Sequence, residues 1–127
     1  MIDAKYFRSE EFDSPDLPGS GSEMDEHFIA MLDICRETAE MPFVVTSGFR
    51  TDQHQAQLKA DGYPVSENSA HLLGKAADIR CRNSSERFNI VGAAIFVGFT
   101  RIGISSTSNF VHLDSAEDKG GPFIWLY

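Results

Sequence analysis

The stretch Ala76-Ala77-Asp78-Ile79-Arg80 decides how the middle of this chain folds, because apolar and polar side chains alternate in it as in a half-buried strand. Successive side chains of a strand point to opposite faces of its sheet. Ala77 and Ile79 therefore share an apolar face. Asp78 points to the opposite face, into whatever covers that side of the sheet.

A second stretch, Phe110-Val111-His112-Leu113-Asp114, alternates in the same way. Val111 and Leu113 are expected to point into the core. His112 and Asp114 then lie on the opposite face, about 7 Å apart along the strand. If the two strands belong to one sheet, a histidine and two carboxylates share one face of it.

Helical and extended patterns surround these two strands. The predicted elements are a helix over 23–40 that begins in a box-like cap at Ser22, a helix from the Thr51 cap to Ala60, a helix from the Asn83 cap to Gly98, and strands over 43–46, 76–80, 101–104, 110–114 and 123–126. The buried stripe of the third helix is predicted as Phe88, Val91, Ala94 and Ile95. Helices before and between short neighbouring strands predict an α+β fold, a small antiparallel sheet with helices on one side.

The size and composition of the chain favour one globular domain over residues 1–127. The chain has 127 residues, of which 42% are hydrophobic and 11% aromatic, so a single core can form. Its formal charge of -8 repels phosphate backbones and anionic lipids. We therefore expect neither nucleic acid nor a membrane surface as a partner, and we expect a monomer.

The first residues, MIDAKYFRSEEF, contain neither a basic segment nor an apolar segment of the kind found in export signals. The apolar runs of the chain are far shorter than the roughly 18 residues that a transmembrane helix needs. We expect a protein that is cytoplasmic as synthesised. Cys35 and Cys81 match no metal or redox motif, and we expect both to be reduced and packed, with a single bridge as the alternative.

His71 is the other histidine in unusual surroundings, since it precedes the first strand described above. In an extended chain His71 and Asp78 would lie over about 20 Å apart, so a shared metal requires the chain to double back. Gly74, which can adopt a positive φ, is well placed for that turn. Two histidines and one carboxylate form the donor set of a catalytic zinc site with one position open for water. From spacing alone, solvated surface residues are the alternative.

Four motifs in fixed order resemble the zinc D-Ala-D-Ala carboxypeptidase family, which includes phage endolysins and vancomycin-resistance dipeptidases. They are Ser47-Gly48-Phe49-Arg50, Ser69-x-His71-x-x-Gly74-x-Ala76-x-Asp78, Gly98-Phe99-x-Arg101-Ile102-Gly103 and Phe110-Val111-His112-Leu113-Asp114. The resemblance begins near Phe7 and covers most of the chain. The histidine and aspartate segment is its most specific part.

The resemblance implies a role for each matching residue. His71, Asp78 and His112 would bind Zn²⁺. Arg50 would hold the substrate and polarise the reacting carbonyl, which suits the paired donors of a guanidinium. Ser69 would lie near the substrate carboxylate, and the alternative for Ser69 is a loop hydroxyl bonded to its own backbone.

One position departs from the pattern. Many relatives carry an Asp or Glu as general base three residues before the last histidine, where this chain has Asn109, which cannot accept a proton at neutral pH. Asp114 is the best substitute as the catalytic base because it shares the face of His112. The alternative role for Asp114 is a hydrogen bond that supports a zinc ligand.

The resulting hypothesis is a zinc metallopeptidase that cleaves peptidoglycan stem peptides, as a D-Ala-type carboxypeptidase or as an endolysin endopeptidase. As an endolysin it would be released to the cell wall with help from another protein. The alternatives are a zinc-binding recognition module with weak or no catalysis, and a structural or assembly protein such as a part of a phage particle. His27 and His54 are expected at the surface. The aromatic group Phe123, Trp125 and Tyr127 is expected to be structural.

Overall fold

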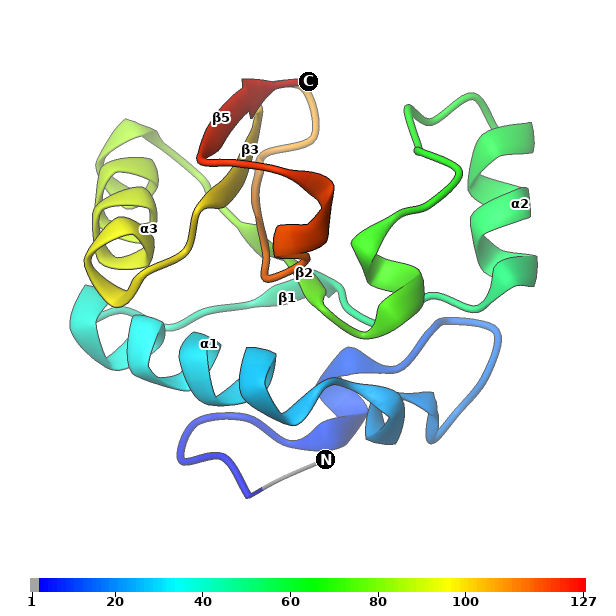
Figure 1. Cartoon of the computed structure of the whole chain (residues 1–127), viewed down its shortest axis with the longest axis horizontal. Helices are drawn as coiled ribbons and strands as arrows, with labels where there is room; N and C mark the ends of the chain where they lie inside the picture. The colour runs from blue at the N-terminus through cyan, green and yellow to red at the C-terminus, as the bar shows by residue number, and fades with distance from the viewer. Residues whose placement is uncertain (1–2) are drawn as a thin grey trace.

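The computed structural model describes residues 3–127, and residues 1–2 lie outside the described part. Its strands are β1 (Val45–Ser47), β2 (Ala76–Arg80), β3 (Arg101–Ser105), β4 (Phe110–Asp114) and β5 (Phe123–Leu126), and its α-helices are α1 (Glu26–Ala39), α2 (Asp52–Ala60) and α3 (Ser84–Val97). One sheet contains the strands in the order β1-β2-β4-β3-β5 (Figure 1). The predicted α+β class is confirmed.

Neighbouring strands run antiparallel, except that β5 lies parallel to β3. The predicted antiparallel arrangement holds for the other pairs, and the parallel pair was not predicted. Its cause lies in the connection after β4, because Arg101 at the start of β3 donates to the carbonyls of Lys119 and Gly120. These bonds hold the connection at the end of the sheet where β3 begins, so β5 starts from that same end.

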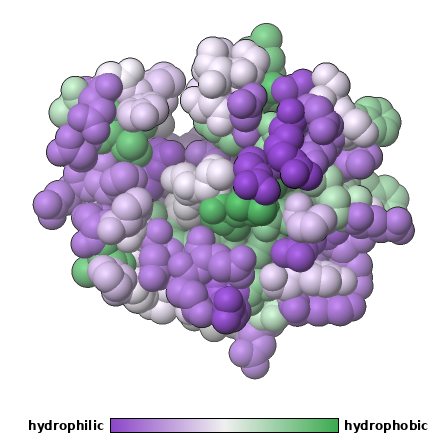
Figure 2. All heavy atoms as spheres, turned by 180° about the vertical axis from the view of Figure 1, so that it is seen from behind, coloured by the Kyte–Doolittle hydropathy of each residue, from purple (hydrophilic) through white to green (hydrophobic). Residues whose placement is uncertain are grey.

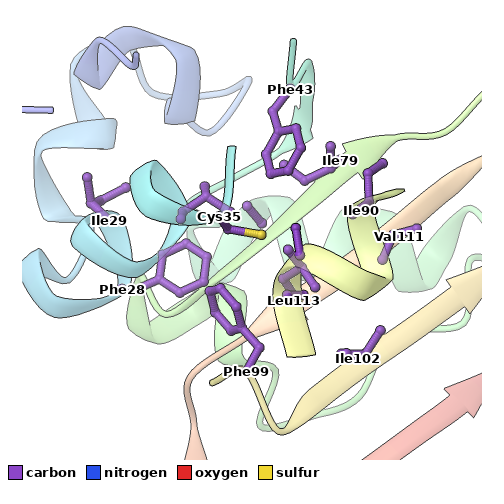
Figure 3. Packing of buried hydrophobic residues seen from close by; sticks show 14 of the residues in the cluster. Phe28, Ile29, Cys35, Phe43, Ile79, Ile90, Phe99, Ile102, Val111 and Leu113 are labelled. Carbon is purple, nitrogen blue, oxygen red and sulfur yellow. The ribbon is translucent and has the colours of Figure 1, made fainter. Parts of the chain in front are cut away.

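Helices α1 and α3 cover one face of the sheet and pack against each other (Figures 1 and 3). The core between them and the sheet consists of apolar side chains from all of these elements, among them Phe28, Ile29, Leu32, Phe43, Ile79, Ile90, Phe99, Ile102, Val111 and Leu113. Helix α2 lies apart from α1 and α3, on the right of Figure 1. These two helices therefore leave the opposite face of the sheet uncovered. Within residues 3–127, no helix has the length and apolar character needed to cross a membrane.

Helix starts follow the expected capping chemistry at two of three positions. The Thr51 side chain accepts a hydrogen bond from the backbone of His54, and the Asn83 side chain accepts one from Glu86, as predicted. Helix α1 begins at Glu26 because Asp25 caps it, while Ser20–Glu23 form a separate 3-10 turn. The predicted start at residue 23 is wrong for that reason.

Two further expectations need correction. The first strand begins at Val45, and Phe43, which was expected in it, is buried in the core ahead of it. In α3, Phe88 is 78% exposed and Ile95 55% exposed, so neither belongs to a buried stripe. The buried residues of α3 are Ile90, Ala93 and Ala94. Apolar residues lie all around α3, so the spacing of apolar residues in the sequence does not identify which side of the helix is buried. The side with Ala93 and Ala94 packs inward, because these small side chains allow the helix to approach the sheet closely.

Both cysteines are buried and free, as expected. Cys35 lies in α1 and points into the core (Figure 3). Burial raises the pKa of the Cys35 thiol to about 12, so this side chain stays protonated and packs as a small apolar group.

The observed orientation of α3 predicts that replacing two isoleucines of this helix by alanine lowers the free energy of unfolding by different amounts. Ile90→Ala should lower the free energy of unfolding by about 2 to 5 kcal/mol, because a buried side chain leaves a cavity. Ile95→Ala should change it by less than about 0.5 kcal/mol, because the side chain is exposed. Urea unfolding of the two variants measures both values. Equal losses would contradict this orientation of the helix.

Candidate metal centre

His71 lies in the short 3-10 turn Ala70–Leu73 that precedes β2. The Ser69 side chain accepts a hydrogen bond from the His71 backbone at 3.2 Å and so caps the turn. Gly74 ends the turn with a φ of 69°, and a Cβ at this position would lie 2.6 Å from the carbonyl oxygen of Glu23. Both the angle and the close approach require glycine. The predicted reversal of the chain between His71 and Asp78 is confirmed.

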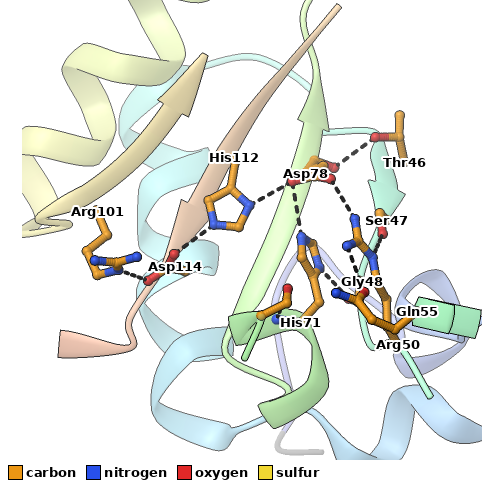
Figure 4. A network of polar contacts seen from close by, with 11 residues as sticks. Thr46, Ser47, Gly48, Arg50, Gln55, His71, Asp78, Arg101, His112 and Asp114 are labelled. Atoms are coloured by element: carbon orange, nitrogen blue, oxygen red, sulfur yellow. Dashed lines mark hydrogen bonds and ion pairs between the residues drawn. The ribbon is translucent and has the colours of Figure 1, made fainter. Parts of the chain in front are cut away.

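Asp78 and His112 are partners in the register of β2 with β4. Their side chains share the face away from α1 and α3, and the turn that carries His71 brings its ring to the same place (Figure 4). His71, Asp78 and His112 are 2%, 4% and 5% exposed. One candidate ligand atom from each lies within 4.8 Å of the other two. The structure thus brings together the three predicted metal ligands.

Hydrogen bonds determine which atom of each ring faces the cluster. His71 Nδ1 lies 2.7 Å from the Gly48 carbonyl oxygen and donates to it, which leaves Nε2 at 3.3 Å from Asp78 Oδ1. His112 Nε2 lies 2.7 Å from Asp114 Oδ2, which leaves Nδ1 at 2.9 Å from Asp78 Oδ1. Tetrahedral ligands at 2.0 to 2.2 Å from one zinc are themselves about 3.3 Å apart. Two imidazole nitrogens and a carboxylate oxygen with these separations fit one such ion.

The electrostatics of the cluster favour an ionised carboxylate. Burial acts against the charge of Asp78, but the adjacent His71 and His112 outweigh it and hold the pKa of Asp78 well below its usual range. Burial lowers the pKa of His71 despite Asp78, so its ring is neutral and can act as a ligand. For His112 burial also acts to lower the pKa, but Asp114 and Asp78 outweigh it and raise the pKa.

Asp114 is 2% exposed and its two oxygens are both engaged. Oδ1 accepts from Arg101 Nε at 2.7 Å and from the Ala116 backbone at 3.1 Å, and Oδ2 lies against His112. Burial opposes the ionisation of Asp114, but His112 and Arg101 outweigh it and lower the pKa. This geometry resembles the carboxylate that supports a metal-ligating histidine. Arg101 was not predicted to have a role of its own, although the pairing of β3 with β4 places it opposite Asp114.

Arg50 follows β1 and lies on the other side of the cluster. Its Nε donates to Ser47 at 3.1 Å, and its two terminal nitrogens donate to Gln55 at 3.2 Å and to Asp78 Oδ2 at 3.4 Å. These contacts use three of the five N–H groups of a guanidinium and leave two for another ligand. Burial lowers the pKa of Arg50, and Asp78 acts in the opposite direction. Gln55, a buried positioning residue from α2, was not identified from the sequence.

A cavity of about 420 Å³ opens over the cluster. One wall comes from α2 and the loop after it, with Leu58 and 63–66, and the floor includes Arg50, Ser69 and the three cluster residues. Figure 2 shows the surface notched on the side where α2 lies, which is the left side in that view. Ser69 lines this cavity, and its hydroxyl accepts the bond that caps its own turn. The backbone contact is thus observed, while a role near a substrate carboxylate stays a prediction.

The opposite wall is aromatic and contains Trp125 and Tyr127 together with Phe110. Trp125 and Tyr127 therefore line the cavity, whereas Phe123 is absent from its described lining. The structural role expected for the three aromatic residues stays a prediction. The Trp125 ring lies 5.4 Å from the His112 ring, measured between centroids. Burial raises the pKa of Tyr127 to about 12, and Asp78 adds to this effect. A parallel pairing of β5 with β3 creates this wall, and nothing local in the sequence signals that pairing.

The remaining candidates lie outside the cavity. Asn109 is exposed in the turn before β4, and its carbonyl accepts from the Cys81 backbone at 2.8 Å. Among residues 3–127, the cavity lining includes neither Asn109 nor His27 nor His54. His27 is exposed and His54 half-buried. Asp78 and Asp114 are the carboxylates that line the cavity within the described part of the chain.

The fold and the cluster define a small α+β domain with a candidate metal site, made of two histidines and an aspartate, beneath a cleft. The chain belongs to the Peptidase M15 family, whose model matches residues 7–114, and the resemblance noted in the sequence is thereby confirmed. Among solved structures it is similar to the crystal structure of Serratia marcescens L-Ala D-Glu endopeptidase ChiX, with 15% identity, coverage of 77% of this chain and 84% of that chain, and a TM-score of 0.57. At this identity the similarity shows the fold. No curated protein matches the chain.

The cluster predicts that the protein binds one metal ion per chain. His71→Ala or His112→Ala should abolish stoichiometric binding, because each removes one of three ligands. His27→Ala, which removes an exposed histidine of α1, should leave binding unchanged. Elemental analysis of the purified proteins after dialysis measures the stoichiometry. Full metal content in either cluster variant would rule out this site.

Proposed function

We propose that this protein is a zinc-dependent peptidase that cleaves peptide bonds in the stem peptides of bacterial peptidoglycan. The observation that supports this most directly is the buried set of His71, Asp78 and His112 at the floor of a cleft, with Arg50 beside it. Membership of the Peptidase M15 family and the similarity in fold to an L-Ala D-Glu endopeptidase support the same reaction class. The substrate bond is either a terminal bond near D-Ala or an internal bond of the stem peptide.

The donor set suits zinc, because two imidazoles and one carboxylate leave a coordination position for substrate or water. Bound zinc would supply Lewis acidity and an activated water. The protein itself contributes the orientation of both rings, through the Gly48 carbonyl for His71 and through Asp114 for His112. A ring that donates one N–H to a fixed acceptor presents its other nitrogen in a fixed direction.

Arg50 is proposed to bind and polarise the substrate. Its guanidinium is held by Ser47, Gln55 and Asp78, so its orientation is set before a substrate arrives. The two remaining N–H groups provide paired donors for a carboxylate or for the oxygen of the scissile carbonyl. Preorganised donors of this kind stabilise a developing negative charge without reorganisation during the reaction.

The charges of the cleft suit an acidic peptide. The cavity is lined by three cationic side chains, Arg50, Arg101 and Lys119, and by the carboxylates Asp78 and Asp114. Both carboxylates are already paired with histidine and arginine side chains. The cavity lining thus carries one more cationic than anionic side chain, in a chain with a formal charge of -8. Stem peptides carry free carboxylates, which such a cleft attracts.

For Asp114 we propose the supporting role rather than that of general base. A base needs a lone pair directed at the water that it deprotonates. Both oxygens of Asp114 are instead directed at Arg101, Ala116 and His112. The Asp114 carboxylate therefore connects Arg101 to His112, one of the candidate metal ligands, through two direct contacts.

The lack of a free oxygen on Asp114 favours one alternative function, a zinc-binding recognition module of the same fold with weak or no catalysis. Position 109, where many relatives have a carboxylate, is an exposed asparagine outside the cavity lining. The described cavity offers no carboxylate that is free of hydrogen-bonding partners. A module of this kind would bind stem peptides through Arg50 and release them unchanged.

Digestion of purified peptidoglycan followed by mass spectrometry of the soluble fragments tests the proposed function. We expect zinc-dependent release of products from one type of peptide bond, whose masses identify the bond. Arg50→Lys should lower the rate by about a hundredfold, because it keeps the charge and loses the paired donors. Arg82→Lys, which alters an exposed arginine paired with Glu86, serves as the matched control. A zinc-loaded protein that binds muropeptides but releases no product would establish the recognition module instead.

Asp114→Asn separates the two roles of Asp114. If Asp114 supports His112, the change should weaken zinc affinity by about 10- to 100-fold, and excess zinc should restore activity. If Asp114 is the base, zinc affinity should be kept while the rate falls by about 10² to 10⁴ at saturating zinc. Zinc competition titrations and rates at several zinc concentrations measure both effects. Activity that excess zinc does not restore would contradict the proposed supporting role.

A further inference from the structure

The side chains on the cleft face of the sheet lie in rows across the strands. Asp78 on β2 pairs with His112 on β4, which pairs with Gly103 on β3, which pairs with Trp125 on β5. Two metal ligands and an aromatic ring therefore share one row, and the position between them carries no side chain. Tyr127 follows Trp125 by two residues, so its side chain emerges on the same face.

Gly103 leaves the space in which both aromatic rings lie. A Cβ at this position would lie 2.7 Å from Trp125 Nε1 and 2.8 Å from Tyr127 Cε2. The ring atom Cε2 of Tyr127 is adjacent to the carbon that bears the hydroxyl. The outer end of this ring is therefore folded back over β3, toward the row that contains His112.

Tyr127 is held in this position from several sides. Its backbone N–H donates to the Ile104 carbonyl at 3.0 Å, which fixes the base of the side chain to β3. Its ring packs against Phe110 at 5.2 Å and against Trp125 at 6.4 Å between centroids. Tyr127, which is 46% exposed, thus lines the cleft from the β5 edge of the sheet, whereas Arg50 lines it from the β1 edge.

We propose that the Tyr127 hydroxyl is a further catalytic group of the proposed peptidase, which donates a hydrogen bond to the scissile carbonyl oxygen as that oxygen gains negative charge. This inference rests on the proposed function. In the reaction, the oxygen of water bonds to the carbonyl carbon, the C–N bond breaks, and the leaving amine takes up a proton. Tyr127 keeps its own proton throughout and acts only as a donor.

The placement of this donor complements Arg50. A peptide carbonyl above the cluster can receive N–H donors from the β1 side and an O–H donor from the β5 side. Hydrogen bonds that are stronger in the transition state than in the bound substrate accelerate the reaction without tightening substrate binding. Loss of one such donor lowers the rate by roughly 10² to 10³ in other hydrolases.

Tyr127→Phe tests the proposal, since it removes one oxygen and keeps the ring. We expect kcat to fall by about a hundredfold, with KM and zinc affinity within about twofold of the parent. Affinity for a phosphinate analogue of the tetrahedral intermediate, measured by calorimetry on zinc-loaded protein, should fall by a similar factor. Tyr6→Phe, which removes a hydroxyl bonded to Glu37 far from the cleft, is the matched control and should change none of these values.

A second variant tests the geometry independently. Gly103→Ala places a methyl group where both rings now lie and should lower kcat at least as far as Tyr127→Phe does. Parent-level kcat and phosphinate affinity in Tyr127→Phe would overturn the catalytic role. A loss confined to KM would overturn it as well, because it would indicate uniform substrate binding. A parent protein without activity on any peptidoglycan would overturn the proposed function too, whereas an active parent with an unimpaired Tyr127→Phe variant overturns this inference alone.

Discussion

The contact between Asp78 and His112 across β2 and β4 is the constraint on which the rest of the site depends. It places a buried carboxylate 2.9 Å from an imidazole nitrogen in the middle of a sheet. A buried charge of this kind is costly unless other groups pair with it. His71 and Arg50 complete the pairing of Asp78, while Asp114 and Arg101 extend it on the far side of His112. Each neighbouring element, from the turn at Gly74 to the start of β3, is arranged to bring one of these partners to the same face.

Strand alternation separates this polar network from the core. The odd-numbered positions of β2 and β4 pack under α1 and α3, while Asp78 and the even-numbered positions of β4 line the cleft on the opposite face. A shift of one residue in the register would bury the cluster among apolar side chains and expose Ile79 and Val111. The core thus fixes the register, and the register fixes the distance between Asp78 and His112. Stability and the geometry of the site are consequences of the same pairing.

The parts of the structure that were predictable from the sequence are those governed by local rules. Alternation over five residues was enough to assign the faces of β2 and β4, and capping chemistry was enough to place Thr51 and Asn83. The orientation of α3 was not predictable in this way, because its apolar residues surround the helix. The aromatic wall depends on two long-range facts, the parallel pairing of β5 and the absence of a side chain at Gly103. The role of Arg101 depends likewise on a neighbouring strand.

The arrangement of donors bears on whether a chain with Asn109 can catalyse hydrolysis. General-base catalysis contributes about 10² to 10⁴ to a rate, and each preorganised donor to an oxyanion contributes about 10² to 10³. The described cleft has no free carboxylate, but it has cationic and phenolic donors on its two sides. In the proposed reaction these donors act on the carbonyl oxygen, and their contributions do not depend on a base at position 109. The absence of a carboxylate at position 109 therefore lowers the rate expected of the proposed peptidase. It does not remove the stabilisation of the transition state by the donors to the carbonyl oxygen, so the proposed reaction is expected to be slow rather than absent.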